Sequence, residues 1–285
     1  MGVLGASAVK LYVMNITFIG GGNMAQAIIG GLLRAKKSTP RALHVVDVDA
    51  EVRQRVERAY SGVRCYEKTG GAIREGDIVL LAVKPQHAEA AVRRLDIETD
   101  AHLIISIAAG VTLQALAQWR KGHTRLVRAM PNTPALIGAG IAALYSFPGV
   151  SETDRQCADK ILSAVGKTVW VKNEDEMNAV TAVSGSGPAY VFLFMEAIER
   201  AAAELKLPRD VAHELTVQTF AGAARLAAES PDSLAVLRER VTSKGGTTEA
   251  ALDSLAHDRI EEAIIRAIKA AHERARRLGK PSDKS

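Results

Sequence analysis

The first half of the chain alternates short apolar runs with longer amphipathic stretches. An apolar run rich in β-branched residues at 15–20 predicts a buried strand, and helical spacing of apolar residues follows it up to Lys36. The same alternation predicts strands at 43–47, 77–82, 102–107, 125–130 and 168–171, separated by helices at 50–60, 86–95, 113–119 and 152–165. Strands spaced by helices indicate βαβ units, so we expect an α/β fold with a Rossmann-type, doubly wound and mostly parallel sheet.

Beyond Asn173 the strand pattern ends and helical spacing alone remains. We expect helices at 177–183, 189–206, 208–229 and 230–241, then one long helix from Glu249 to a stop at Gly279. This change of pattern divides the chain into an α/β domain, 14–173, and an all-α domain, 174–285. The long helix carries more apolar surface than so small a domain can readily cover. That favours burial against a second subunit, with a monomeric bundle as the alternative.

Composition narrows the class of protein. The net charge of +5 is dispersed over 285 residues, and no basic stripe with interleaved aromatics points to nucleic acid. Cys65 and Cys157 are isolated and match neither a metal-binding spacing nor a disulfide framework, as expected in a reduced cytoplasm. Residues 1–13 are too short to span a membrane, and Lys10 follows their apolar part, unlike a secretory signal. We expect a cytoplasmic protein without nucleic-acid or membrane partners, with 1–13 as a disordered extension.

A glycine-rich loop follows the first predicted strand and opens the first predicted helix. Gly20, Gly22 and Ala25 match G-x-G-x-x-G/A in that context. The first glycine makes a tight turn, the second lets the backbone approach a pyrophosphate, and the small third residue lets helix and strand pack closely. The 14–173 domain is therefore predicted to bind a dinucleotide. The expected contacts around the loop are Ile19, Gly20, Gly22, Asn23 and Met24.

Other loops follow the strands at the same edge of the expected sheet. They hold small residues and prolines, which let a flat ring approach the backbone; ordinary turn chemistry is the alternative reading. These segments are Ala82, Val83, Lys84 and Pro85, then 107–110, and then 130–134. Asp47 ends the second strand, where an acidic residue holds the ribose hydroxyls of NAD and repels the 2′-phosphate of NADP. Asp47 lies further beyond the glycine loop than is usual, and Arg53 and Arg55 follow it. The choice between NADH and NADPH therefore stays open, with a lean to NADH.

A glycine pair flanked by hydroxyl residues interrupts the helical half. Residues 241–248 read Val-Thr-Ser-Lys-Gly-Gly-Thr-Thr. Gly245 and Gly246 can take positive φ, and Thr247 or Thr248 can cap the helix expected from Glu249. Successive backbone N–H groups in front of a helix attract a small anion such as a carboxylate. The alternative is a plain turn and cap.

Five segments together resemble one enzyme family. They are Phe18–Ala25, Ala82–Pro85, Arg128–Pro134, Ser184–Tyr190 and Val241–Thr248. Their order and spacing resemble pyrroline-5-carboxylate reductase over about residues 15–278, and the strings MPNTP and SGSGPAY are specific to it. Lys244 departs from the family, which more often has proline there. The resemblance implies reduction of 1-pyrroline-5-carboxylate to L-proline with NADPH or NADH, the last step of proline biosynthesis.

The resemblance also implies roles for particular residues. The Ser243 hydroxyl and the backbone amides of Gly245, Gly246, Thr247 and Thr248 would hold the substrate carboxylate, while the catalytic Thr248 hydroxyl would bond the ring nitrogen. Ala108, Met130 and Asn132 would line the nicotinamide, and Glu229 is a further candidate near the imine. Hydride transfer to an already protonated imine needs positioning rather than a metal or a strong acid. The family further implies a homodimer, or larger rings built from dimers, so that one subunit's substrate loop reaches its partner's glycine loop.

Two other functions compete with this one. A β-hydroxyacid dehydrogenase also joins a dinucleotide-binding fold to a helical domain, but it needs a lysine soon after a glycine motif in the position of Ser184–Pro188. Here no lysine follows Gly187 before Lys206. A non-catalytic nicotinamide-nucleotide sensor would keep the glycine loop but would have no reason for a carboxylate site at 241–248.

Overall fold

The computed structural model describes residues 14–73 and 78–278, which fall into two compact units. The first unit comprises the residues up to Gly185 together with those from His272 onward, and the second is Ser186–Ala271. The expected extension at 1–13 and the expected helix stop at Gly279 lie outside the described residues.

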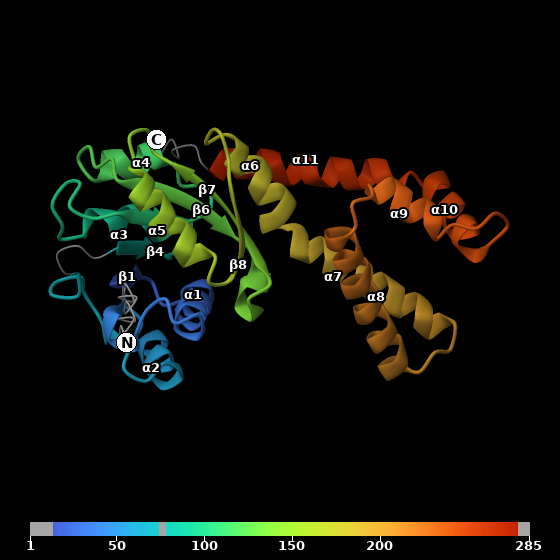
Figure 1. Cartoon of the computed structure of the whole chain (residues 1–285), viewed down its shortest axis with the longest axis horizontal. Coiled ribbons are helices and arrows are strands. Elements are labelled where there is room, and N and C mark those ends of the chain that lie inside the picture. Colours follow the sequence, from blue (N-terminus) through green and yellow to red (C-terminus); the bar gives the residue numbers. More distant parts are fainter. Residues whose placement is uncertain (1–13, 74–77, 279–285) are drawn as a thin grey trace, which may run out of the picture. The chain divides into compact units, whose positions relative to one another are not determined.

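The first unit is built on an eight-stranded sheet (Figure 1). Its strands are β1 (Ile16–Ile19), β2 (Leu43–Val46), β3 (Arg64–Tyr66), β4 (Ile78–Leu81), β5 (Ile104–Ser106), β6 (Leu126–Pro131), β7 (Gly140–Ser146) and β8 (Gly166–Trp170). They lie in the order β3-β2-β1-β4-β5-β6-β7-β8. Neighbours are parallel except for β6 and β7, which are antiparallel. The predicted doubly wound, mostly parallel sheet is confirmed.

Helices cover both faces of this sheet, and each face has its own apolar cluster. The helices are α1 (Asn23–Arg34), α2 (Ala50–Ala59), α3 (Pro85–Arg93), α4 (Leu113–Trp119) and α5 (Glu152–Leu162), with short η1 (Pro40–Ala42) and η2 (Thr133–Ile137). Ile78 and Leu80 belong to one cluster and Val79 and Leu81 to the other. Successive strand side chains point to opposite faces, so a strand covered on both sides has a continuous apolar run. That is why the central strands were evident in the sequence.

Two strands were not expected from the sequence. Strand β3 has only three residues, and they are exposed or half-buried, so it carries no apolar run. Strand β7 is rich in small residues and follows η2 after a short turn at Gly138, which is left-handed with φ of +76°. Because it pairs antiparallel with β6 after only the short η2, no crossover α-helix separates the two and the βαβ pattern is lost.

The second unit is helical, as expected. Its helices are α7 (Gly187–Glu204), α8 (Arg209–Glu229), α9 (Leu234–Arg240) and α10 (Thr247–His257), together with most of α11 (Ile260–Leu278). The prediction of one long helix from Glu249 was wrong, because α10 and α11 are separated at Asp258 and Arg259. Arg259 has φ of +53°, in the left-handed region that a helix cannot continue through. The apolar spacing runs across this break and so concealed it.

A short helical segment, π-helical in its second half, joins the sheet to the second unit. The expected helix at 177–183 is α6 (Glu176–Val180) followed by the π-helical turn η3 (Thr181–Gly185). The segment from Ser184 to Pro188 was expected to interrupt the helix. The chain instead stays coiled through Gly185, and α7 begins at Gly187 with Pro188 in its first turn, where the missing N–H of proline is tolerated.

A polar cluster lies at the amino-terminal edge of the sheet, between β5 and β6. His123 is fully buried; its Nδ1 accepts from the backbone N–H of Asp100 at 3.0 Å and its Nε2 lies 2.9 Å from the His102 carbonyl oxygen. The Asp100 carboxylate accepts from the backbone N–H groups of Thr124 and Arg125. Burial lowers the pKa of His123 from its ordinary 6.5.

This burial predicts an acid sensitivity of the fold. The pKa of His123 is lower in the folded state than in the unfolded state, so the unfolded state binds more protons as the pH falls below about 6.5. The stability that the fold gains by keeping His123 neutral is complete above that pH, and it is lost as the pH falls through the folded-state pKa. We expect His123→Gln to weaken the drop in melting temperature between about pH 7.5 and about pH 5.5. His87→Gln, at an exposed histidine on α3, is the matched control. An equal drop in wild type and the His123 variant would contradict this account.

Candidate active site

Four of the segments predicted for cofactor binding meet at one edge of the sheet. Strands β1, β4, β5 and β6 are neighbours, and the predicted segments follow their carboxyl ends. The N–H of Ala82 donates to the Ile19 carbonyl at 2.8 Å, and the N–H of Ile107 donates to the Leu81 carbonyl at 3.0 Å. The strand order reverses between β1 and β4, which is where a doubly wound sheet binds its ligand. The structure therefore places these segments where the fold forms a site.

The glycine loop has the geometry that a dinucleotide requires. Gly20 has φ of +99°, and a Cβ on it would lie 2.8 Å from the Ala82 carbonyl oxygen. A Cβ on Gly22 would meet nothing within 4 Å, and Gly22 is the N-cap of α1, with no side chain bonded to the first turn. The first N–H groups of α1 can thus be approached closely by phosphate oxygens. Asn23 is exposed beside them, Met24 is half-buried and Ile19 is buried in β1. These residues fit a pyrophosphate.

Asp47 ties the loop after β2 to the glycine loop. One carboxylate oxygen accepts from the N–H of Gly21 at 2.8 Å and the other accepts from the N–H of Asp49 at 2.9 Å. Arg53 donates to the carbonyl oxygens of Asp47 and Val48 at 2.7 and 3.0 Å. The Arg53 guanidinium therefore holds the backbone of this loop, while the Asp47 carboxylate keeps lone pairs for a ribose hydroxyl.

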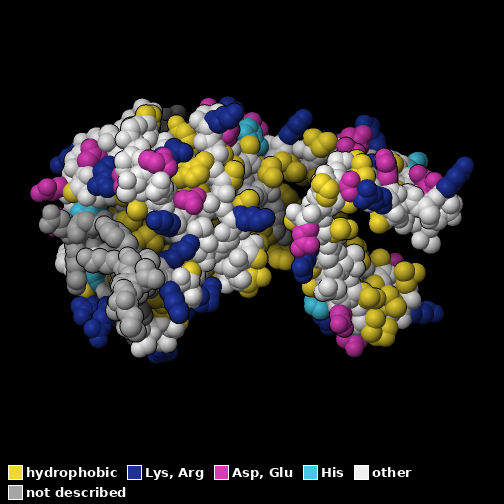
Figure 2. Space-filling model, in the orientation of Figure 1, with side chains coloured by type: hydrophobic (Ala, Val, Ile, Leu, Met, Phe, Trp, Pro, Cys, Tyr) yellow, Lys and Arg dark blue, Asp and Glu magenta, His cyan; other side chains and the backbone are white. Residues whose placement is uncertain are grey.

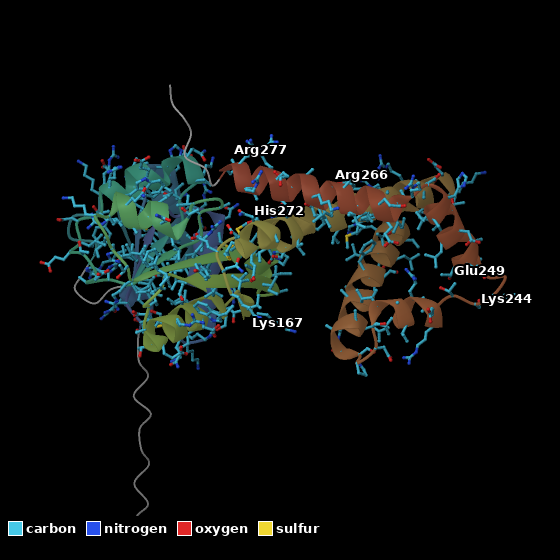
Figure 3. All side chains as sticks on the ribbon, turned by 90° about the horizontal axis from the view of Figure 1, so that it is seen from above. Lys167, Lys244, Glu249, Arg266, His272 and Arg277 are labelled. Atoms are coloured by element: carbon cyan, nitrogen blue, oxygen red, sulfur yellow. The ribbon has the colours of Figure 1, made fainter. Side chains whose placement is uncertain are left out.

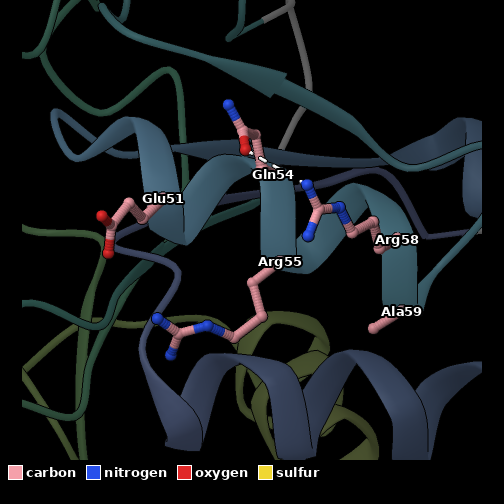
Figure 4. A pocket seen from close by; sticks show the side chains of 5 residues that line it. All are labelled: Glu51, Gln54, Arg55, Arg58 and Ala59. Carbon is pink, nitrogen blue, oxygen red and sulfur yellow. Dashed lines mark hydrogen bonds between the residues drawn. The ribbon is translucent and has the colours of Figure 1, made fainter.

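The second arginine after Asp47 has different surroundings. Arg55 lines an open hollow of about 590 Å³ on α2, together with Glu51, Gln54, Arg58 and Ala59 (Figure 4). Arg58 donates to the Gln54 side chain at 3.4 Å. All five residues come from one helix, and none is a predicted site residue.

The loops expected around the nicotinamide are held by local contacts. Lys84 is the N-cap of α3 and Pro85 its first residue, a position where proline is favoured, and Val83 before them is half-buried. Ala108 is buried and its N–H lies 3.3 Å from the Ser106 hydroxyl. Asn132 uses both ends of its amide: Nδ2 donates to the Ser184 carbonyl at 3.2 Å and Oδ1 accepts from the N–H of Ile141 at 3.0 Å.

A partly buried ion pair supports β6, the strand that carries Met130 and leads into Asn132. Arg128 of β6 lies 2.9 Å from a Glu174 carboxylate oxygen, and that oxygen also accepts from the N–H of Leu113 at 2.8 Å. The Arg128 side chain is only 4% exposed. The pair joins β6 to the start of α4 and to the segment that leads into α6. Sequence reasoning missed it because nothing local relates two charges so far apart in the chain.

The loop predicted to hold a substrate carboxylate lies between α9 and α10 in the second unit. Gly245 has φ of +70°, but Gly246 has φ of −88°, so the expectation of positive φ holds for Gly245 alone. A Cβ on Gly246 would lie 2.5 Å from the Ser243 hydroxyl oxygen, and the Gly246 N–H donates to the Ser243 carbonyl at 3.0 Å. Glycine at 246 thus lets the Ser243 side chain fold over the loop.

Helix α10 begins earlier than expected and is capped differently. It starts at Thr247, with Gly246 as N-cap and no side-chain cap, so the prediction of a threonine cap was wrong. Thr247 and Thr248 instead form the first turn, whose N–H groups have no acceptor within a helix. Glu249 accepts from the N–H of Gly245 at 2.7 Å, and Figure 3 labels it near Lys244, which is exposed. An acidic residue three positions after an N-cap is the signal that could have revealed Glu249.

The last candidate from the sequence is Glu229. It ends α8, and its carboxylate lies 2.8 Å from Arg225 one turn earlier. Among the residues that the structure describes, no cluster of histidine, cysteine, aspartate or glutamate could hold a metal ion. Within those same residues, no helix is both long and apolar enough to cross a membrane.

Comparison with known proteins places the chain in one family. The family described as "Pyrroline-5-carboxylate reductase dimerisation" matches residues 174–278, and "NADP oxidoreductase coenzyme F420-dependent" matches residues 15–110. The pyrroline-5-carboxylate reductase of Pasteurella multocida is 42% identical over 93% of this chain and 98% of its own length. That of Haemophilus influenzae is 43% identical over 92% of this chain and 97% of its own length.

Solved structures agree with this assignment. A pyrroline-5-carboxylate reductase from Coxiella burnetii has a TM-score of 0.87 at 40% identity, covering 94% of this chain and 100% of that one. The enzyme from Plasmodium falciparum, solved with NADP bound, has a TM-score of 0.84 at 27% identity, covering 94% of this chain and 98% of that one. The resemblance expected from the five sequence segments is confirmed. The chain belongs to the pyrroline-5-carboxylate reductase family.

Proposed function

We propose that this protein reduces 1-pyrroline-5-carboxylate to L-proline, the last step of proline biosynthesis, with NADPH or NADH as the hydride donor. The observation that carries the proposal is similarity along nearly the whole chain. Relatives named pyrroline-5-carboxylate reductase are 37–43% identical over 92–94% of it. The class expected from the sequence, an NAD(P)H-dependent oxidoreductase acting on a C=N bond, is thereby confirmed.

The strand ends and the glycine loop are suited to hold the cofactor. A bound nicotinamide supplies a hydride from its C4 position to the imine carbon. We assign the phosphates to the N–H groups at the start of α1, beside Gly22 and Asn23, where a Cβ on Gly22 would meet no neighbour. Ala108 and Met130, at the ends of β5 and β6, would flank the ring. Their role is to fix the distance and angle of hydride transfer, which is where such a site gains most of its rate.

The loop at 243–248 is suited to hold the substrate. The Ser243 hydroxyl and the first-turn N–H groups of α10 are donors that would hold its carboxylate. Glu249 takes the N–H of Gly245 at 2.7 Å, so a substrate carboxylate must compete with this side chain for that donor. Lys244 adds a cation beside the loop. The Thr248 hydroxyl would bond the ring nitrogen, which arrives protonated and therefore needs no strong acid.

Assembly and location extend this proposal. The match to a dimerisation family makes the protein a homo-oligomer. We propose an obligate dimer as the minimal unit, with the loop of one subunit reaching the glycine loop of the other, and larger rings built from such dimers.

We also propose a cytoplasmic location, which fits the two free thiols of Cys65 and Cys157. We retain 14–173 and 174–285 as the domain limits, since the dimerisation family begins at residue 174.

The second unit supports the dimer because it has almost no core. Within 186–271 the only buried residues are Ala202, Ala212 and Thr216. Large apolar side chains of α7 and α8 are instead more than half exposed, among them Phe192, Leu193, Leu215 and Leu226. Figure 2 shows hydrophobic side chains gathered over this helix pair. So large an apolar surface is typical of helices that fold against a second copy.

The catalytic assignment is tested with the Thr248 hydroxyl. Purified protein is mixed with 1-pyrroline-5-carboxylate and NADH or NADPH, and the absorbance of the reduced cofactor is followed. We expect turnover by the wild type and a loss of roughly 10- to 1000-fold in Thr248→Ala, because a hydrogen bond that stabilises the transition state is removed. Thr248→Ser keeps the hydroxyl and should recover most of the rate. No turnover by the wild type with either cofactor would refute the function, and unchanged kinetics in Thr248→Ala would remove this residue from the mechanism.

Cofactor preference is tested with the Asp47 carboxylate. Asp47→Asn removes the negative charge that repels a 2′-phosphate, and its single side-chain oxygen can accept from only one of the two backbone N–H groups that Asp47 binds. We expect the ratio of kcat/KM for NADPH to that for NADH to rise by roughly tenfold, the scale of one charge at a partly exposed site. Asp49→Asn, which removes the same charge at the N-cap of α2, is the matched control and should shift the ratio less. Equal shifts in both variants would mean that Asp47 does not face the ribose.

The dimer is tested by light scattering on dilute protein. We expect no monomer at concentrations where activity is measured. Leu215→Lys should produce monomer and reduce activity, because it puts a charge into apolar surface that the partner covers. A fully active monomer would rule out the interlocked arrangement.

A further inference from the structure

The π-helical turn η3 has no role in the function described so far. Its five residues, Thr181–Gly185, are the last of the first unit before the chain enters the second. The Thr181 hydroxyl donates to the Met177 carbonyl at 2.7 Å and the Ser184 hydroxyl donates to the Val180 carbonyl at 3.1 Å. These bonds tie the turn back onto α6. Single π-helical turns are rare and are frequent at functional sites, which directs attention to what this turn contacts.

The first contact is polar and involves the end of β6. The Asn132 amide bridges the Ser184 carbonyl of the turn and the backbone N–H of Ile141 in β7. One side chain thus joins the turn, the end of β6 and the adjacent strand. The amide donates and accepts at the same time, so its orientation is fixed by its two partners.

The second contact is steric and depends on a missing side chain. A Cβ on Gly185 would lie 2.6 Å from the terminal methyl carbon of Met130. The next nearest atoms would be 3.8 Å away on Thr181 and 3.9 Å away on Met130 itself, which are ordinary contacts. The φ of Gly185 is outside the left-handed region, so alanine there is not strained by the backbone. The methyl of Met130 therefore lies where a side chain at position 185 would be.

We propose that Gly185 is a positioning residue that sets the side chain of Met130 at the nicotinamide end of the site. The proposal rests on the proposed function, in which Met130 flanks the nicotinamide. The hydrogen bond from Asn132 holds the turn against the end of β6. Because residue 185 has no side chain, the Met130 methyl can occupy that space. A methyl group added at 185 displaces the flexible end of Met130 rather than the backbone. The nicotinamide ring would then contact a displaced Met130 side chain, while the fold is unchanged.

The test is a double-mutant cycle of Gly185→Ala and Met130→Ala. Each variant is measured for the dissociation constant of NADH, by the fluorescence of the reduced nicotinamide, for kcat and KM with 1-pyrroline-5-carboxylate, and for melting temperature. We expect Gly185→Ala to lower kcat by roughly tenfold or more, since small displacements at a reacting centre have such effects, with little change in melting temperature. In the Met130→Ala background the same substitution should have no further effect. Gly187→Ala, where a Cβ would meet nothing within 4 Å, is the matched control.

Each outcome decides the proposal. Unchanged kcat and unchanged NADH binding in Gly185→Ala would overturn it, and so would an equal loss in both backgrounds, because the effect would then not pass through Met130. A Gly185→Ala protein that fails to fold would support the contact if Met130→Ala restores folding and would overturn the proposal if it does not. A wild type that binds NADH but reduces no imine would refute the proposed function alone. The NADH dissociation constants of the four proteins would then still test whether Gly185 acts through Met130.

Discussion

The functional edge of the sheet depends on how closely the chain turns after β1. Gly20 is left-handed, and a side chain there would lie 2.8 Å from the carbonyl oxygen of Ala82 on the neighbouring strand. This close approach lets the loop pass from β1 into α1 at the point where the strand order reverses. A larger residue would separate β1 from β4 where the cofactor segments meet. The close approach of Gly20 to the Ala82 carbonyl is therefore a condition for the cofactor segments to meet.

Polar side chains hold the loops around that edge, and each joins segments distant in the sequence. Asp47 accepts from the glycine loop and from the turn after β2. Arg128 pairs with Glu174, whose carboxylate also receives an N–H from the start of α4. Asn132 joins η3 to β7. Imine reduction by hydride transfer requires accurate positioning more than acid strength, so a site made of rigid loops and small residues suits it.

The two units differ in how they are stabilised. The sheet buries apolar clusters on both faces and has a core of its own. The helices of the second unit bury almost nothing, and their apolar side chains remain exposed. So large an exposed apolar surface favours association of this unit with a second copy. The membership of this unit in a dimerisation family has the same physical basis.

The sequence by itself determined the features that depend on local order. The central strands, the alternation with helices, the glycine loop and the family strings all follow from residues close together in the chain, as does the Ser151 cap of α5. Tertiary structure decided the rest. Strand β7 exists because β6 and β8 pair with it, and the left-handed Arg259 divides α10 from α11 although the apolar spacing continues. The partners of Asp47, Glu174 and Gly185 likewise depend on which elements pack together, because hydrogen bonds and steric contacts between distant segments leave no periodic signal in the sequence.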